Sequence, residues 1–233
     1  MAAPTRESSR MGDPKMLISY FCTQGAMGRF IKNLELQKSY PAWERFDKIL
    51  VTDLTTQFSH SAFLDVLRHD VHVNRQGCFG GSCNMGLEYA RRKDYDFFLN
   101  GEADLVITAW PSELRQGAFY TKVKEDPPAC RVINWYLVGR DLMGLKWCEE
   151  YAGCGYTDND YEDIVLCGEG GAQFYDSGSW GMHVHHPVHP FNQTSQFLAN
   201  GAKYRERFLE ARRKYPNIVS RTMRELNGWK PWG

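Results

Sequence analysis

Two carboxylates with a single residue between them, Glu102 and Asp104, end an apolar run that begins at Phe97. Carboxylate oxygens are the ligands that hard divalent cations prefer, and buried carboxylates need a positive partner. The run is short and rich in β-forming residues, which favours a buried strand. Alternate residues of a strand point the same way, so we expect both carboxylates on one face. Taken alone, the segment fits a metal-binding pair and solvated acids at a strand end equally well.

A histidine segment lies far downstream, where four of the seven histidines fall within positions 183–189. His183 and His185 would share a face of an extended segment and could add nitrogen ligands to a carboxylate-bound metal such as manganese. A solvated or proton-sensitive histidine loop is the alternative. No further ligand stands at zinc-site spacing, so the sequence does not predict a structural zinc site.

A third acidic group follows a glycine turn, in the segment Gly155–Asp160. Acids at a loop-to-helix junction often cap the helix. One of them could instead act as a general base toward a hydroxyl nucleophile, which requires reach and a suitable pKa. The sequence has no GxSxG, no GxxxxGK[ST] loop and no GxGxxG after its first strand, which disfavours hydrolase, P-loop and dinucleotide-binding functions.

The elements that would position these groups alternate between strand and helix over the first 110 residues. The expected strands are 16–23, 46–52, 71–74 and the run from 97, and the expected helices are 30–39, 61–68 and 84–92, the last after a glycine turn at 78–82. This alternation indicates an α/β fold with a largely parallel sheet. Ligands bind beyond the carboxyl ends of such strands, where we expect Thr23, Asp53 and Arg75 to join the acid pair. Beyond residue 111 we expect strands at 132–138 and 173–175, and helices at 142–151, 197–214 and 219–226.

Composition excludes some classes of function. Lys plus Arg and Asp plus Glu number 28 each, and this balance argues against a general nucleic-acid binder. An anionic ligand would therefore be held by local groups or by a metal. No apolar run approaches the roughly 20 residues that cross a bilayer, and residues 1–15 read as a disordered lead-in. Seven scattered cysteines favour reduced thiols and a cytoplasmic protein.

In combination and in order, these features resemble a glycosyltransferase of the GT-A type. The first half is similar to the inverting nucleotide-sugar transferases, with Asp53 after the second strand, a helix start at Gly80–Gly86 that contains Asn84, and a strand leading to an acid-x-acid motif. The second half resembles the carboxyl-terminal region of the animal β-galactosyltransferases. There a Gly-x-Gly-x-x-Asp-x-Asp motif, here residues 153–160, precedes a histidine segment, here 183–186.

The resemblance implies one GT-A domain, Rossmann-like with a mostly parallel sheet, over residues 16–233. It would comprise a nucleotide-sugar half (16–110), an acceptor half (111–196) and a helical segment (197–233). The resemblance also implies a UDP-sugar donor, a glycan acceptor and Mn²⁺ or Mg²⁺. The implied site residues are donor-binding Thr23, Asp53, Arg75, Asn84, Glu102 and Asp104; metal-binding Glu102, Asp104, His183 and His185; the base Asp158; and Asp160, which would orient the acceptor.

Some positions depart from the family pattern. The usual pair is Asp-x-Asp, whereas this chain has Glu102 first, and Thr157 and Asn159 stand where the galactosyltransferases carry acids. Either Asp158 or Asp160 could therefore be the base. The alternatives to sugar transfer are a nucleotidyltransferase on a similar scaffold, for which residues 23–29 make a poor phosphate loop, and a non-catalytic sugar- or metal-binding domain.

Overall fold

The computed structural model describes residues 13–53, 71–74, 78–110, 114, 118–120, 123–124, 136–152, 155–172, 174–176, 181–184 and 195–218. Its centre is a seven-stranded sheet with the strand order β3-β2-β1-β4-β8-β6-β9. These strands are β1 (Met16–Cys22), β2 (Asp47–Asp53), β3 (Val71–Asn74), β4 (Phe97–Glu102), β6 (Ala118–Tyr120), β8 (Tyr136–Gly139) and β9 (Phe174–Asp176). All neighbouring pairs are parallel except the two that β8 makes, so the expected mostly parallel α/β sheet is confirmed.

A second, smaller sheet joins segments that are far apart in the sequence. Its strands are β5 (Leu105–Ile107), β7 (Val123–Lys124) and β10 (Gly181–His183), in the order β5-β10-β7. β10 runs antiparallel to β5 and parallel to β7. This sheet therefore connects the chain that follows the acid pair to the start of the histidine segment.

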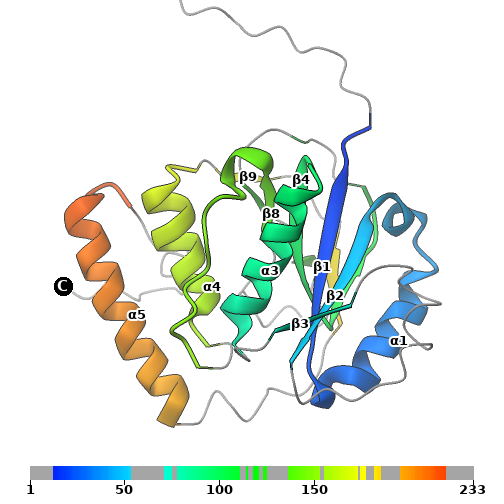
Figure 1. The fold of residues 1–233 in the computed structure, drawn as a ribbon, viewed down its shortest axis with the longest axis horizontal. Helices are drawn as coiled ribbons and strands as arrows, with labels where there is room; N and C mark the ends of the chain where they lie inside the picture. Colours follow the sequence, from blue (N-terminus) through cyan, green and yellow to red (C-terminus); the bar gives the residue numbers. More distant parts are fainter. Residues whose placement is uncertain are drawn as a thin grey trace, which may run out of the picture.

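Strand β1 separates two apolar cores. Its even-numbered residues face helix α1 (Met27–Gln37) and pack near Phe30 and Leu34, whereas Leu17 belongs to the core beneath helix α3 (Phe79–Arg92). This two-residue alternation is the period of a strand that is buried on both faces. Figure 1 shows α1 and α3 on opposite sides of β1. Three short 3₁₀ turns complete this part: η1 (Gln24–Ala26), η2 (Pro41–Arg45) and η3 (Arg140–Leu142).

Two further helical elements extend the layer that α3 begins. Helix α4 (Thr157–Asp160) continues as a π-helical segment (Tyr161–Glu169), and α5 (Ser195–Lys214) packs beside it. Figure 1 shows α3, α4 and α5 next to one another. A third apolar core lies between the last two and includes Tyr151, Ile164, Tyr204 and Phe208. No helix within the described ranges is long and apolar enough to cross a membrane.

The start of α3 differs from the expected glycine turn at 78–82. The helix begins at Phe79, and the thiol of Cys78 caps it by accepting from the backbone N–H of Gly81 at 3.2 Å. Gly80 lies in this first turn, where a Cβ would collide with the carbonyl oxygen of Cys148. The glycine therefore permits close packing of the helix and does not interrupt it.

The expected helix at 142–151 is wrong. The chain makes only the short turn η3 and then runs irregularly to residue 152. The backbone N–H of Trp147 donates to Oδ1 of Asn84 at 2.8 Å, so a side chain of α3 takes a bond that a helix would have used. The expected helices at 61–68 and 219–226, and residues 132–135 of an expected strand, lie outside the described residues.

Candidate active site

The acid pair lies where the chain leaves the large sheet. β4 ends at Glu102, Ala103 and Asp104 form a turn, and β5 begins at Leu105. The carboxylates therefore do not alternate along one strand, as the sequence had suggested, because the strand ends between them. Asp104 is only 4% exposed, and burial, followed by the charges of Asp104 and Asp158, raises the pKa of Glu102 well above its ordinary value.

Helix α1 holds this turn with two buried amide side chains. Nδ2 of Asn33 donates to the carbonyl oxygen of Ala103 at 2.6 Å. Nε2 of Gln37 donates to the carbonyl oxygen of Ile107 at 2.5 Å, and Oε1 of Gln37 accepts from the Ile107 N–H at 2.5 Å. The two amides are four residues apart and lie on one face of the helix. The position of the acid turn therefore depends on α1 as well as on β4.

Arg29 is one turn before Asn33 on the same face of α1. Its positive charge lowers the pKa of Glu102, opposing the effects of burial and of the neighbouring carboxylates. Nε of Arg29 is buried and has no hydrogen-bond partner among the described residues. A buried guanidinium N–H normally finds an acceptor, so Arg29 is suited to an anionic group of a ligand.

The polar face of α1 that contacts the acid turn was not predicted from the sequence. Among the apolar residues of the expected helix 30–39, Phe30 and Leu34 are buried, but Ile31 is 43% and Leu36 is 38% exposed. The three residues at helical spacing, Arg29, Asn33 and Gln37, were the available signal. Polar residues at such spacing normally indicate a solvated face, so the pattern did not predict that the side chains of Asn33 and Gln37 are buried against the acid turn.

The histidine segment reaches the acid turn through its backbone. His183 pairs with Leu105 in the small sheet, and the N–H of Val184 donates to the carbonyl oxygen of Asp104 at 2.9 Å. The side chain of His183 and all of His185 lie outside the described residues. Their role as metal ligands stays a prediction, now with the backbone of residues 183 and 184 beside the acid turn.

Asp158 belongs to the first turn of α4 and is 8% exposed. Burial raises the pKa of its carboxyl to about 6, against the lowering effect of its own backbone N–H and that of Asn159, and the charge of Asp163 raises it further. A carboxylate that titrates near neutral pH is suited to accept a proton in catalysis.

The charges of Glu102 and Asp158, which come from the two halves of the chain, both act on the buried thiol of Cys83. Burial raises its pKa, and the charges of Glu102, Cys78 and Asp158 raise it further. The charge of Asp158 also acts on Glu102. The acid turn after β4 and the first turn of α4 therefore share one electrostatic environment, although they are distant in sequence.

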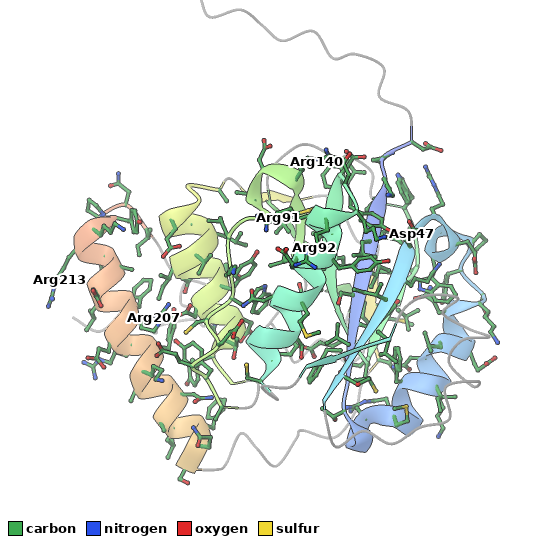
Figure 2. All side chains as sticks on the ribbon, viewed as in Figure 1. Asp47, Arg91, Arg92, Arg140, Arg207 and Arg213 are labelled. Atoms are coloured by element: carbon green, nitrogen blue, oxygen red, sulfur yellow. The ribbon has the colours of Figure 1, made fainter. Side chains whose placement is uncertain are left out.

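Asp160 has a different environment from Asp158. Its carboxylate is fully buried and accepts from the hydroxyl of Tyr151 at 2.9 Å and from Nε and Nη2 of Arg207 at 2.7 and 3.3 Å. Figure 2 shows Arg207 on α5, on the side that faces α4. Of the two candidate bases, Asp160 is thus the one whose carboxylate oxygens already accept hydrogen bonds from protein donors.

Of the remaining predicted donor-binding residues, Thr23 and Asp53 lie at strand ends on the expected edge, Asn84 lies within α3, and Arg75 is outside the described residues. Thr23 follows β1, and its carbonyl oxygen accepts from the N–H of Ala26 at 3.0 Å. Asp53 is the last residue of β2, but its side chain and all of Arg75 lie outside the described residues. Nδ2 of Asn84 donates to the carbonyl oxygen of Trp147 and to Glu149, at 3.0 and 2.7 Å. Donor binding by these four residues stays a prediction.

The acid turn suits a hard divalent cation by the chemistry of its donors. Glu102 and Asp104 supply carboxylate oxygens. The pKa of Glu102 is raised first by burial and then by the charges of Asp104 and Asp158, a repulsion that a bound cation would relieve. Within the part of the chain that the structure describes, no three His, Cys, Asp or Glu side chains form a metal-binding group by themselves. A complete shell would therefore need a ligand such as His183 or His185, or a bound substrate.

Comparison with known proteins finds solved structures with a similar fold. No protein-family model matches this sequence, and no curated protein sequence matches it either. Solved structures do: S. aureus TarS superposes with a TM-score of 0.55 at 14% identity, over 92% of this chain and 46% of TarS. Residues 1–349 of TarS in complex with UDP-GlcNAc give 0.58 at 12% identity, over 84% of this chain and 66% of that chain. The chain has the GT-A fold.

Two other sugar-transferring proteins share this fold. Mannosyltransferase PcManGT from Pyrobaculum calidifontis, in complex with GDP-Man and Mn²⁺, gives a TM-score of 0.56 at 14% identity, over 86% of this chain and 64% of that chain. Glucosyl-3-phosphoglycerate synthase from Mycobacterium tuberculosis, in complex with Mn²⁺, UDP-glucose and phosphoglyceric acid, gives 0.51 at 11% identity, over 82% and 80%. The present chain spans about half the length of TarS.

Proposed function

We propose that this protein is a glycosyltransferase that moves a sugar from a UDP-sugar to a hydroxyl acceptor with inversion at the anomeric carbon. One observation carries the proposal: the charges of Asp104 and Asp158, from the two halves of the chain, both act on Glu102. In the proposed function, such an arrangement would serve to bring donor-binding carboxylates and a base together at the ligand edge of the sheet. The solved structures of the same fold with bound nucleotide-sugars support this choice of substrate class.

In this reaction, the acceptor oxygen attacks the anomeric carbon while the bond from that carbon to the diphosphate oxygen breaks. The electron pair leaves with the nucleoside diphosphate, and the acceptor proton passes to a base. We assign the base to Asp158, because its pKa of about 6 leaves it ionised at neutral pH. Asp160 is the weaker candidate, since its carboxylate already accepts from Tyr151 and Arg207.

Two groups would meet the negative charge of the donor. Glu102 and Asp104 would hold Mn²⁺ or Mg²⁺, which when bound stabilises the charge that develops on the diphosphate. Arg29, whose charge acts on Glu102 and whose buried Nε has no hydrogen-bond partner in the described part of the chain, would donate to a diphosphate oxygen. This division of charge suits a protein whose net formal charge is zero, because local groups replace long-range attraction.

A donor screen followed by product analysis tests the proposal. Thermal shift with UDP-glucose, UDP-GlcNAc and GDP-mannose, with and without MnCl₂, should single out a UDP-sugar, because a ligand that binds the folded state raises its stability. Release of nucleoside diphosphate should follow, with the Asp158→Asn variant binding the donor but losing turnover. Release of pyrophosphate would indicate nucleotidyl transfer, and binding without any release would indicate a non-catalytic domain. Full turnover in Asp158→Asn would refute the assignment of the base.

A further inference from the structure

Helix α5 contacts the segment that carries Asp158 on both sides of that residue. We propose that α5 is a positioning element for Asp158, and that Asn200, Tyr204 and Arg207 hold the residues around it in place. This inference rests on the proposed function, since it gives a role to groups beside the same carboxylate. The three residues recur at intervals of four and three, so they lie on one face of the helix.

Asn200 contacts the part of the chain that comes before Asp158 in the sequence. Its side chain is 2% exposed, and its Nδ2 donates to the carbonyl oxygen of Ala152 at 2.8 Å and of Gly155 at 3.0 Å. One amide thereby joins two points of the chain just before α4 begins. Because buried carbonyl groups need donors, this side chain fixes the path by which the chain enters the helix.

Tyr156 is a strained residue that α5 supports. It lies immediately before α4 with a φ of 64°, in the left-handed region that a bulky side chain rarely adopts. Its ring packs on Phe197 and Tyr204, at centroid distances of 4.9 and 5.7 Å, and a Cβ at Gly201 would lie 3.0 Å from it. Strain of this kind persists only where the surroundings impose it, and here α5 supplies these surroundings.

After Asp158 in the sequence, residues of α5 donate hydrogen bonds to two buried carboxylates. Arg207 holds Asp160 with two nitrogens, and the hydroxyl of Tyr204 donates to Oδ2 of Asp163 at 2.5 Å. Both carboxylates are fully buried, so each needs these donors to compensate for the cost of removing its charge from water. Asp160 is thus an anchor two residues from the proposed base, while its contact with the acceptor stays a prediction.

These polar contacts exceed what is needed to dock the helix. The apolar core that contains Tyr151, Ile164, Phe208 and Ala211 already joins α5 to its neighbour. Apolar packing is non-directional and tolerates small displacements. Hydrogen bonds to defined backbone and carboxylate atoms have direction, so they restrict the position of the first turn of α4 more narrowly than apolar packing does, as positioning of a base requires.

The test compares Arg207→Gln with Arg213→Gln, a matched change near the end of the same helix, where Arg213 points outward (Figure 2). Hydrogen exchange of peptides that cover residues 155–163 should become at least about tenfold faster in Arg207→Gln and stay unchanged in Arg213→Gln. For nucleoside diphosphate release, kcat should fall roughly 10- to 100-fold in Arg207→Gln while KM for the donor stays within about twofold. Asn200→Ala supplies a second, milder variant with the same expected pattern.

Two results would overturn the inference: unchanged exchange at residues 155–163 in Arg207→Gln and Asn200→Ala, or a rise in donor KM that accounts for the whole loss of turnover. Failure of the proposed function would look different. In that case the wild-type protein would neither bind nor turn over a nucleotide-sugar, while the exchange measurement would still decide whether α5 holds the segment around Asp158.

Discussion

The side chain of Gln37 forms a two-way hydrogen bond with the backbone of Ile107, donating to its carbonyl oxygen and accepting from its N–H, each at 2.5 Å. The side-chain amide thus pairs with the backbone of β5, the strand after the acid turn, in the way that a residue of a neighbouring strand would pair with it. The side chain is 1% exposed, so both bonds are formed away from water. Gln37 and Asn33 thus attach helix α1 to the segment that carries Asp104.

Replacing Gln37 with alanine should lower the free energy of unfolding by about 2–4 kcal/mol, because two buried backbone groups of Ile107 lose their partners. Lys32→Ala on the exposed side of α1 is the control and should change it by about 0.5 kcal/mol or less. Urea unfolding of the two variants and the wild type checks this. Equal stabilities of Gln37→Ala and Lys32→Ala would show that the amide adds nothing.

Divalent cations should stabilise the wild-type protein. MnCl₂ should raise the melting temperature by relieving the repulsion among Glu102, Asp104 and Asp158, and EDTA should reverse the shift. The Asp104→Ala variant should lose most of this response, while Asp141→Ala, an exposed acid after β8, should keep it. A shift of the same size in all three proteins would place the cation elsewhere.

The turnover of the enzyme should depend on the ionisation of Asp158. A base must be deprotonated to accept the acceptor proton, so kcat/KM should rise with pH through about 6 and then level off, because this ratio reports the pKa values of the ligand-free enzyme. A profile of kcat/KM against pH measures this. A profile that is flat between pH 5 and 7 would be inconsistent with Asp158 as the base.

The same carboxyl should reduce the stability of the fold at neutral pH. Its pKa is higher in the folded protein, about 6, than the ordinary 3.8, so the folded state binds this proton more tightly. The stability that it contributes is therefore greatest below pH 3.8 and falls as the pH rises through 6. Asp158→Asn removes this cost and should gain up to about 3 kcal/mol at pH 7.5 and much less at pH 4.5. Denaturant unfolding at the two pH values gives the difference, which must grow with pH for this account to hold.

Two glycines in helices should respond to alanine in opposite directions. A Cβ at Gly86 of α3 would lie 2.5 Å from Oγ of Ser19 and 2.8 Å from the ring of Phe98, so Gly86→Ala should destabilise the fold by about 1–3 kcal/mol. At Gly28 of α1, no atom of the described residues outside the neighbouring helix backbone lies within 4 Å of that position, and Gly28→Ala should stabilise the fold by up to about 1 kcal/mol. Melting curves of both variants check the signs, and destabilisation by both would contradict this account of the packing.

Most strands and helices of the fold could be predicted from the periodicity of apolar residues. The strands β1 to β4 and the helix α5 were predicted from local patterns, because buried strands and amphipathic helices repeat at fixed intervals. The helix expected at 142–151 failed, because Asn84 of α3 takes the N–H of Trp147. Local sequence contains no sign of such a partner.

The roles of the candidate site residues stay predictions. The order of the motifs suggested that Glu102, Asp104 and Asp158 act together, and the structure adds that the charges of Asp104 and Asp158 both raise the pKa of Glu102. The division of roles between Asp158 and Asp160 could not be predicted, because it depends on Arg207, which is distant in sequence and lies on another helix.

The pairing of Leu105 with His183 also has a consequence for the order in which the protein folds. Strands β1, β2 and β4 and helix α3 can assemble from the first hundred residues, whereas β10 must return from the far end of the chain to meet β5. Closing so long a loop costs entropy that only a few strand bonds repay, so we expect this junction to form late and to open first. The acid turn would then acquire its final surroundings only after the rest of the fold has formed.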